Sequence, residues 1–139
     1  MSKPPTIVLV EDNHDHLRMT TRILERSGIK ASLHVARDGK EALALLDSMK
    51  HARVPDLVLL DLNMPRMSGR EVLRAMKSDP ALAHVPVVVI SSSNRDEDVS
   101  LAKSLGAAGF VSKAEGIEKL AKSLSILKRF LPPEEGSDR

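Results

Sequence analysis

The chain has 139 residues, enough for one domain over residues 1–139, with its core at about 6–131 and flexible ends at 1–5 and 132–139. Cysteine is absent, which excludes disulfides and thiolate metal sites, and the 21 basic and 19 acidic side chains form no concentrated basic stripe. Two Phe are the only aromatic residues, and no apolar run approaches the roughly 20 residues that span a bilayer. We expect no secretory leader. The sequence therefore predicts a cytoplasmic protein that binds neither nucleic acid nor a membrane.

Five short apolar runs recur along the chain. They are TIVLV (6–10), SLHVA (32–36), DLVLL (56–60), PVVVI (86–90) and GFVS (109–112). Three of these runs are continuously apolar rather than alternating, which is typical of strands covered on both faces. We therefore predict five strands, three of them covered on both faces.

The segments between these runs carry apolar residues at helical spacing. The expected inward faces are Leu17, Thr21 and Leu24; Ala42, Leu45, Leu46 and Met49; Val72, Leu73 and Met76; and Val99, Ala102 and Leu105. A further stripe in the last segment consists of Ile117, Leu120, Ala121, Leu124, Leu127 and Leu131. The sequence thus predicts five helices.

Capping residues and glycines mark the ends of these helices. Three capping side chains stand three residues before a carboxylate: Asp38 before Glu41, Ser68 before Glu71, and Asn94 before Glu97. Asn13 caps the first helix, and Gly28 and Gly106 stand where the first and fourth helices should end. Strict alternation of strand and helix predicts an α/β fold with a five-stranded, doubly wound parallel sheet.

Polar residues follow the predicted strands at one edge of this sheet, where ligands bind in doubly wound folds. They are Glu11, Asp12, Asp61, Ser91 and Lys113. Three close carboxylates repel one another, so they share protons or hold a divalent cation, and oxygen ligands without His or Cys favour Mg²⁺. A carboxylate beside that ion can form an acyl phosphate, while Lys113 and the Ser91 hydroxyl neutralise phosphoryl oxygens. None of the five histidines has the spacing of a metal site.

The chain resembles the receiver domains of bacterial two-component response regulators over essentially residues 6–131. The matching stretches are VLVEDN, ARDGKEAL, PDLVLLDLNMPRMSG, VPVVVISSS and GAAGFVSK. The resemblance implies a flavodoxin-like sheet with strand order 2-1-3-4-5 and five helices. It also implies that Asp61 is the phosphoacceptor and that Ser91 and Lys113 contact the phosphoryl group. By the same resemblance Glu11, Asp12, Asp61 and the backbone carbonyl of Asn63 bind Mg²⁺, and Phe110 is the switch aromatic.

One position departs from the family, because Ala114 follows Lys113 where receivers usually have a proline after a cis bond. A cis bond to a residue other than proline costs about 3 to 4 kcal/mol, and both isomers stay open at this bond. Within the family, the SSSNRDED stretch and the missing proline after the lysine, together with the expected lack of an output domain, resemble stand-alone regulators that pair with bacterial phytochrome-type histidine kinases. A sensor histidine kinase of this type is the expected partner.

Two other functions stay open on the sequence alone. An aspartyl-phosphate phosphatase would use the same nucleophile and Mg²⁺, but Asn63 stands where its general acid is needed and no residues are left for a substrate pocket. A degenerate receiver that acts only as an interaction module would lack motif residues that this chain retains.

Two apolar residues of the predicted last helix face away from its core stripe. Ile126 and Phe130 are one turn apart on the opposite side of that helix. Scattered apolar residues on a surface are common, but this pair also suits a seam across a two-fold axis. We therefore expect a homodimer built partly on the last helix.

Overall fold

The computed structural model describes residues 4–26, 28–62, 69–91, 96–112, 122 and 131. Five parallel strands form one sheet with the order β2-β1-β3-β4-β5, as the sequence predicts. The strands are β1 (Thr6–Val10), β2 (Ser32–Ala36), β3 (Leu57–Asp61), β4 (Val87–Ser91) and β5 (Gly109–Ser112). All residues of β1, β3 and β4 are buried.

Two strands, β3 and β4, begin one residue later than the predicted apolar runs. The carboxylate of Asp56 accepts a hydrogen bond of 2.7 Å from the N–H of Thr6, so Asp56 holds the start of β1 instead of continuing β3. Pro86 has no N–H to donate, and the paired part of β4 begins at the next residue. The predicted starts at positions 56 and 86 were therefore one residue too early. Asp61 ends β3, as predicted, whereas Ser91, which was expected to follow its strand, is the last residue of β4.

Four helices lie within the described part of the chain: α1 (His14–Arg26), α2 (Gly39–Lys50), α3 (Gly69–Ser78) and α4 (Asp96–Ser104). The predicted fifth helix falls outside the described residues, apart from positions 122 and 131. None of the described helices combines the length and apolar character that a bilayer crossing requires.

The helix ends follow the predicted caps where the structure describes them. Asn13 Oδ1 accepts a hydrogen bond of 2.9 Å from the N–H of His16, and Asp38 Oδ1 accepts one of 2.8 Å from the N–H of Glu41. Gly28 and Gly106 have positive φ angles of 76° and 94°, the left-handed conformation that ends a helix. The predicted caps Ser68 and Asn94 lie outside the described residues.

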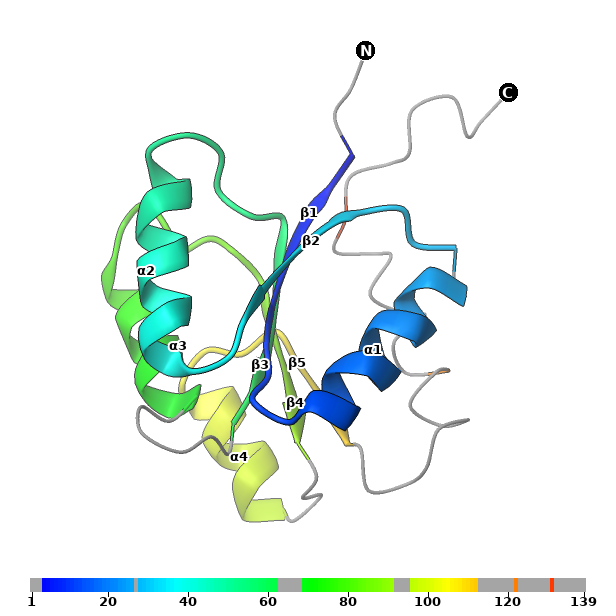
Figure 1. Cartoon of the computed structure of the whole chain (residues 1–139). Helices are drawn as coiled ribbons and strands as arrows, with labels where there is room; N and C mark the ends of the chain where they lie inside the picture. Colours follow the sequence, from blue (N-terminus) through cyan, green and yellow to red (C-terminus); the bar gives the residue numbers. More distant parts are fainter. Residues whose placement is uncertain are drawn as a thin grey trace.

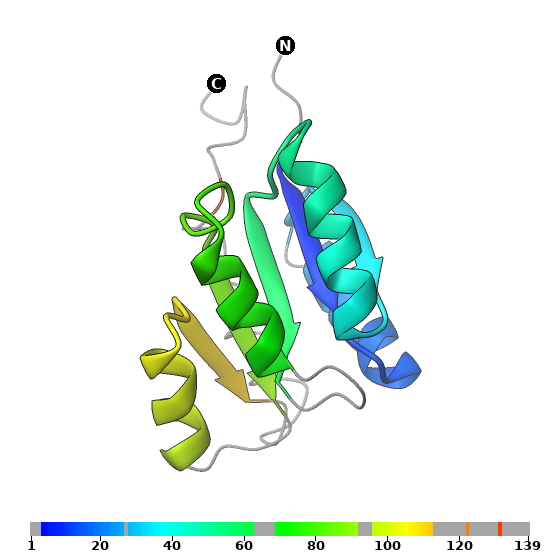
Figure 2. The ribbon, with the colours of Figure 1, turned by 90° about the vertical axis from the view of Figure 1, so that its left-hand side faces the viewer.

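Helices cover both faces of the sheet. Figure 1 shows α1 on one side of it, and Figure 2 shows α2, α3 and α4 side by side across the other. Alternate residues of each central strand contribute to the two cores, so Val8, Val58 and Leu60 pack with α2 and α3. Ile7, Leu9, Leu57 and Leu59 pack with Ile23 and Leu24 of α1.

The predicted inward face of α1 was partly wrong. Thr20, Ile23 and Leu24 are the buried residues of this helix, whereas Leu17 and Thr21 are only partly buried. The helix is turned so that Ile23 and Leu24 together enter the core next to β1 and β3, and Leu17 packs at the margin of that core. The face predicted for α3 is confirmed, since Val72, Leu73 and Met76 are all fully buried. In the face predicted for α2, Ala42 and Leu46 are fully buried, whereas Leu45 and Met49 are partly buried and pack against the same core.

An ion pair joins the end of α2 to the turn after α3. Lys50 Nζ lies 2.8 Å from Asp79 Oδ2 and 3.0 Å from Asp47 Oδ1, and the hydrogen bonds to these carboxylates raise the pKa of Lys50. The pKa of Asp79 is lowered, mainly by the hydrogen bond from Lys50 and to a smaller extent by one from the N–H of Ala81. This pair lies outside the polar edge formed by the carboxyl ends of the strands.

Candidate functional site: an acidic cluster at the carboxyl edge of the sheet

The first part of the site is the turn that leaves β1. Glu11 continues the ladder beyond the strand, because its N–H donates to the carbonyl of Ala36 at 3.0 Å. The side chain of Glu11 is only 1% exposed, and its Oε2 accepts a bond of 3.3 Å from the N–H of Asn13. Asp12 follows and is half-buried. The apolar strand thus carries two successive acids to the edge of the sheet, one of them deeply buried.

The second part of the site comes from the ends of β3 and β4. Asp61 is the last residue of β3, is 6% exposed, and lies opposite Ile90 in the ladder. Ser91 is the last residue of β4 and is fully buried. Because β1, β3 and β4 run parallel, their carboxyl ends meet at one edge of the sheet. This pairing brings Asp61 and Ser91 to the same edge as Glu11 and Asp12, as the sequence predicts.

Three carboxylates meet at this edge. Glu11, Asp12 and Asp61 each offer an oxygen, and these atoms all lie within 4.8 Å of one another. At such separations like charges repel strongly, so the cluster favours a nearby cation. Hard oxygen ligands from a few carboxylates suit Mg²⁺, which binds through one or two carboxylates and keeps several waters. The donor set therefore fits a divalent cation.

A small apolar cluster joins the acidic edge to the α4 side of the sheet. Leu62, which directly follows Asp61, is 1% exposed and packs with Val89 and Ala102 of α4. Phe110 on β5 lies opposite Val89 in the ladder, is half-buried, and packs against the same cluster. The predicted switch residue is thus in one apolar cluster with the neighbour of Asp61.

Five residues of the predicted site and seam are not among those that the structure describes. Asn63, Lys113 and Ala114 lie outside the described residues, and so do Ile126 and Phe130 of the predicted dimer seam. The described part of the predicted site therefore consists of Glu11, Asp12, Asp61, Ser91 and Phe110.

The structure adds two residues that sequence reasoning missed. Arg37, at the end of β2, donates from Nη2 to the backbone carbonyl of Asp12 at 3.2 Å. Gly69, the first residue of α3, is buried against the backbone at Asp61 and Leu62, and its N–H donates to the carbonyl of Leu62 at 3.2 Å. A glycine inside the first turn of a helix was a usable signal, whereas nothing local marks Arg37, which lies 25 positions from Asp12.

Comparison with known proteins agrees with this arrangement. A model of the response regulator receiver domain matches residues 7–125. The chain belongs to the family of response regulator receiver domains, which are phosphoacceptor signalling domains of two-component systems rather than classical enzymes.

The relatives include regulators of phytochrome signalling. Response regulator Rcp1 of Synechocystis sp. is 35% identical over 133 residues, which cover 93% of this chain and 90% of Rcp1. The phosphorylated cyanobacterial phytochrome response regulator RcpA has 35% identity and a TM-score of 0.82, with 94% of this chain and 100% of that chain covered. The Mn²⁺-bound form of Rcp1 has 34% identity and a TM-score of 0.80 with the same coverage.

The contact at Gly69 predicts a large effect of one added methyl group. In Gly69→Ala the new Cβ would overlap the carbonyl oxygen of Asp61 and lie 2.8 Å from Cα of Leu62, and both neighbours are backbone atoms. We expect the free energy of unfolding to fall by at least about 2 kcal/mol, because backbone cannot move aside as a flexible side chain does. Urea denaturation measures this loss.

Gly109→Ala is the matched control for that measurement. A Cβ at Gly109 would make an ordinary contact of 3.6 Å with a methyl group of Val88, so this variant should unfold within about 0.5 kcal/mol of the wild type. Equal stability of the two variants would show that the backbone at Asp61 is not held by Gly69.

Proposed function

We propose that this protein accepts a phosphoryl group from a sensor histidine kinase onto Asp61 and thereby changes its partner-binding surface. The observation that carries the proposal is the meeting of three carboxylates within 4.8 Å at the ends of β1 and β3. Membership of the receiver family supports it, as does the buried Ser91 hydroxyl at the end of the next strand.

In this proposal each residue has a separate chemical task. A carboxylate oxygen of Asp61 attacks phosphorus, a P–O bond forms, and the P–N bond to the kinase histidine breaks. The electron pair of that bond goes to the ring nitrogen, and the histidine leaves as neutral imidazole because its other nitrogen carries a proton. Glu11 and Asp12, together with Asp61 and the Asn63 carbonyl, would hold Mg²⁺. When bound, this ion supplies positive charge that offsets the phosphoryl oxygens.

Ser91 and Lys113 complete the proposed set of phosphoryl contacts. The Ser91 hydroxyl can donate to one phosphoryl oxygen, and the Lys113 ammonium group can pair with another. Positioning and charge neutralisation are the main contributions to this kind of transfer, so no further general acid or base is required. Phosphotransfer would therefore be catalysed by the receiver's own residues.

The signalling step in this proposal uses Ser91 and Phe110. A bond from Ser91 to the phosphoryl group would pull the end of β4, which is paired with β5. Phe110 packs in the cluster of Leu62, Val89 and Ala102, so it would repack inward and reshape the surface of α4 and β5. A partner would read that altered surface.

We propose a phytochrome-type histidine kinase as the phosphoryl donor. The similarity to RcpA supports this choice, since RcpA is a cyanobacterial phytochrome response regulator and its chain is covered in full. The chain's SSSNRDED stretch also resembles regulators of that kind.

The role of Asp61 is tested by Asp61→Asn. The amide is nearly isosteric with the carboxylate but is not nucleophilic, so phosphorylation should be abolished while the circular dichroism stays the same. Incubation with acetyl phosphate and Mg²⁺, followed by intact mass, measures uptake of one hydroxylamine-sensitive phosphoryl group. Asp15→Asn, an exposed acid on α1, is the control and should be phosphorylated like the wild type.

Continued uptake of such a group by Asp61→Asn would refute Asp61 as the acceptor. Failure of the wild type to take up phosphate would instead favour a receiver that acts only as an interaction module.

The metal assignment is tested by thermal unfolding with and without Mg²⁺. An ion that binds only the native state stabilises it by about 2.7 kcal/mol at 100 times its Kd, so the wild-type Tm should rise. Asp12→Ala removes one of the three carboxylates and should lose most of that rise, whereas Asp15→Ala should keep it. A full Mg²⁺-induced shift in Asp12→Ala would exclude Asp12 as a ligand.

We also propose that two copies of the chain associate through the segment carrying Ile126 and Phe130. Sequence spacing supports this seam, because both side chains lie opposite the apolar stripe of the predicted last helix. Sedimentation should show a dimer for the wild type and a monomer for Ile126→Lys with Phe130→Glu, at unchanged circular dichroism. Lys122→Ala on the same segment is the control, and an unchanged association state of the double variant would reject the seam.

A further inference from the structure

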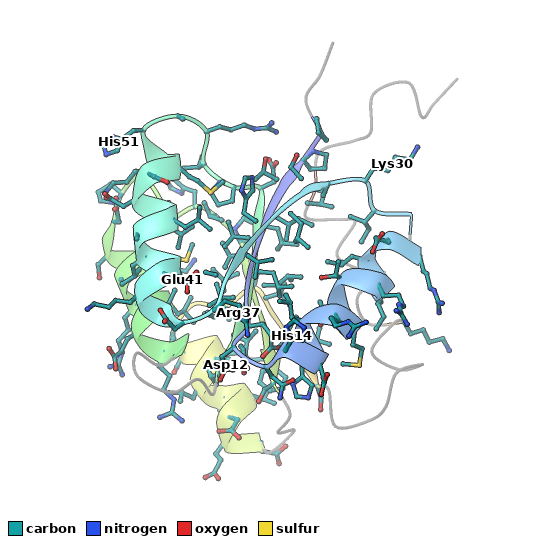
Figure 3. All side chains as sticks on the ribbon, in the orientation of Figure 1. Asp12, His14, Lys30, Arg37, Glu41 and His51 are labelled. Carbon is teal, nitrogen blue, oxygen red and sulfur yellow. The ribbon has the colours of Figure 1, made fainter. Side chains whose placement is uncertain are left out.

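Arg37 links the end of β2 to the acidic turn after β1. The two strands are paired through Val10 and Ala36, and the N–H of Glu11 bonds to the carbonyl of Ala36 at 3.0 Å. Arg37 follows directly, and its Nη2 reaches the backbone carbonyl of Asp12 at 3.2 Å. Figure 3 shows Arg37 and Asp12 at the same edge of the sheet. One backbone bond and one side-chain bond therefore hold the two acids against β2.

The guanidinium group of Arg37 has a different kind of partner from that of Arg53. Arg53 pairs with the carboxylate of Asp56 at 3.3 Å, whereas Arg37 makes no salt bridge in the described part of the chain. Its bond to Asp12 goes to a neutral carbonyl and uses one of five guanidinium N–H donors. Arg37 is also exposed. It therefore brings a positive charge and spare donors to the rim of a cluster of three acids.

That charge has opposite effects on the two species that must enter the site. A phosphodonor is an anion and is repelled by Glu11, Asp12 and Asp61, so a cation at the rim raises its rate of encounter. Mg²⁺ is a cation, and the same guanidinium group weakens its binding. Both effects act through water at the rim and are reduced by salt, because the Debye length is only about 8 Å at physiological ionic strength.

We propose that Arg37 is a positioning residue of the acceptor site, which anchors the Asp12 backbone and draws the anionic phosphodonor toward the carboxylate cluster. This inference rests on the proposed phosphoacceptor function. The anchoring and the charge are separable, since glutamine keeps an N–H donor without the charge and lysine keeps the charge without the planar fork.

The experiment compares Arg37→Gln and Arg37→Lys with the wild type. Mg²⁺ affinity is measured by calorimetry, and initial rates of phosphorylation by acetyl phosphate are measured by intact mass at saturating Mg²⁺ and at low and high salt. Arg18→Gln, which removes the same charge from an exposed position on α1, is the matched control. Thermal unfolding checks that each variant is folded.

In Arg37→Gln we expect Mg²⁺ to bind about 2- to 5-fold more tightly, while phosphorylation becomes slower by a similar factor and less dependent on salt. Arg37→Lys should restore both values toward the wild type, and Arg18→Gln should change neither. Tighter Mg²⁺ binding together with slower phosphorylation would indicate that the charge of Arg37 attracts the phosphodonor. Structural damage would instead weaken Mg²⁺ binding and slow phosphorylation together.

Two results would overturn the proposal. One is an Arg37→Gln protein that has the same Mg²⁺ affinity and phosphorylation rate as Arg18→Gln. The other is a loss of both Mg²⁺ affinity and phosphorylation rate in Arg37→Gln that Arg37→Lys also shows. Failure of the wild type to be phosphorylated would count against the proposed function itself, and the Mg²⁺ titration would still test the charge of Arg37.

Discussion

The site depends on the parallel pairing of three buried strands, which holds like charges together at one edge of the sheet. Residues of β1, β3 and β4 are packed on both faces, so the ends of these strands have little freedom to separate. The carboxylates of Glu11, Asp12 and Asp61 therefore remain within 4.8 Å of one another despite their repulsion. The apolar core offsets that repulsion, and a cation relieves it. The geometry that brings these carboxylates together thus also suits a divalent cation.

The backbone at Asp61 and Leu62 is closely packed against the start of α3. Gly69 at the start of α3 leaves room for the carbonyl of Asp61 and for Cα of Leu62, and its own N–H bonds to the carbonyl of Leu62. Preorganisation of this kind suits phosphoryl transfer, in which positioning and charge contribute more than acid or base chemistry. Because the backbone at Asp61 is closely packed, a displacement at this residue also displaces the side chains that pack next to it.

The outward route proposed here is short. Leu62 follows Asp61 and packs with Val89 and Ala102, and Phe110 borders the same cluster. The acidic edge and the surface of α4 and β5 therefore share one small apolar cluster. Interiors are densely packed, so a shift of Leu62 or Ser91 must be taken up by neighbouring side chains. Phe110 is half-buried, which gives it space to repack.

The sequence by itself determined the elements and the chemical types at their ends. Continuous apolar runs, caps such as Asp38, and glycines such as Gly28 depend on local preferences that act over a few residues, and the structure confirms them. Alternation of strand and helix then placed Asp12 and Asp61 at the same edge, because parallel strands end together.

Only the tertiary structure decided which groups touch across that edge. The bond from Arg37 to the Asp12 carbonyl joins residues 25 positions apart, and Gly69 at the start of α3 closely approaches the backbone at Asp61. The rotation of α1, which buries Ile23 and Leu24 together, likewise depends on the shape of the sheet beneath it. Periodicity specifies which side of an element is apolar, but distances between elements result from packing every side chain into one core.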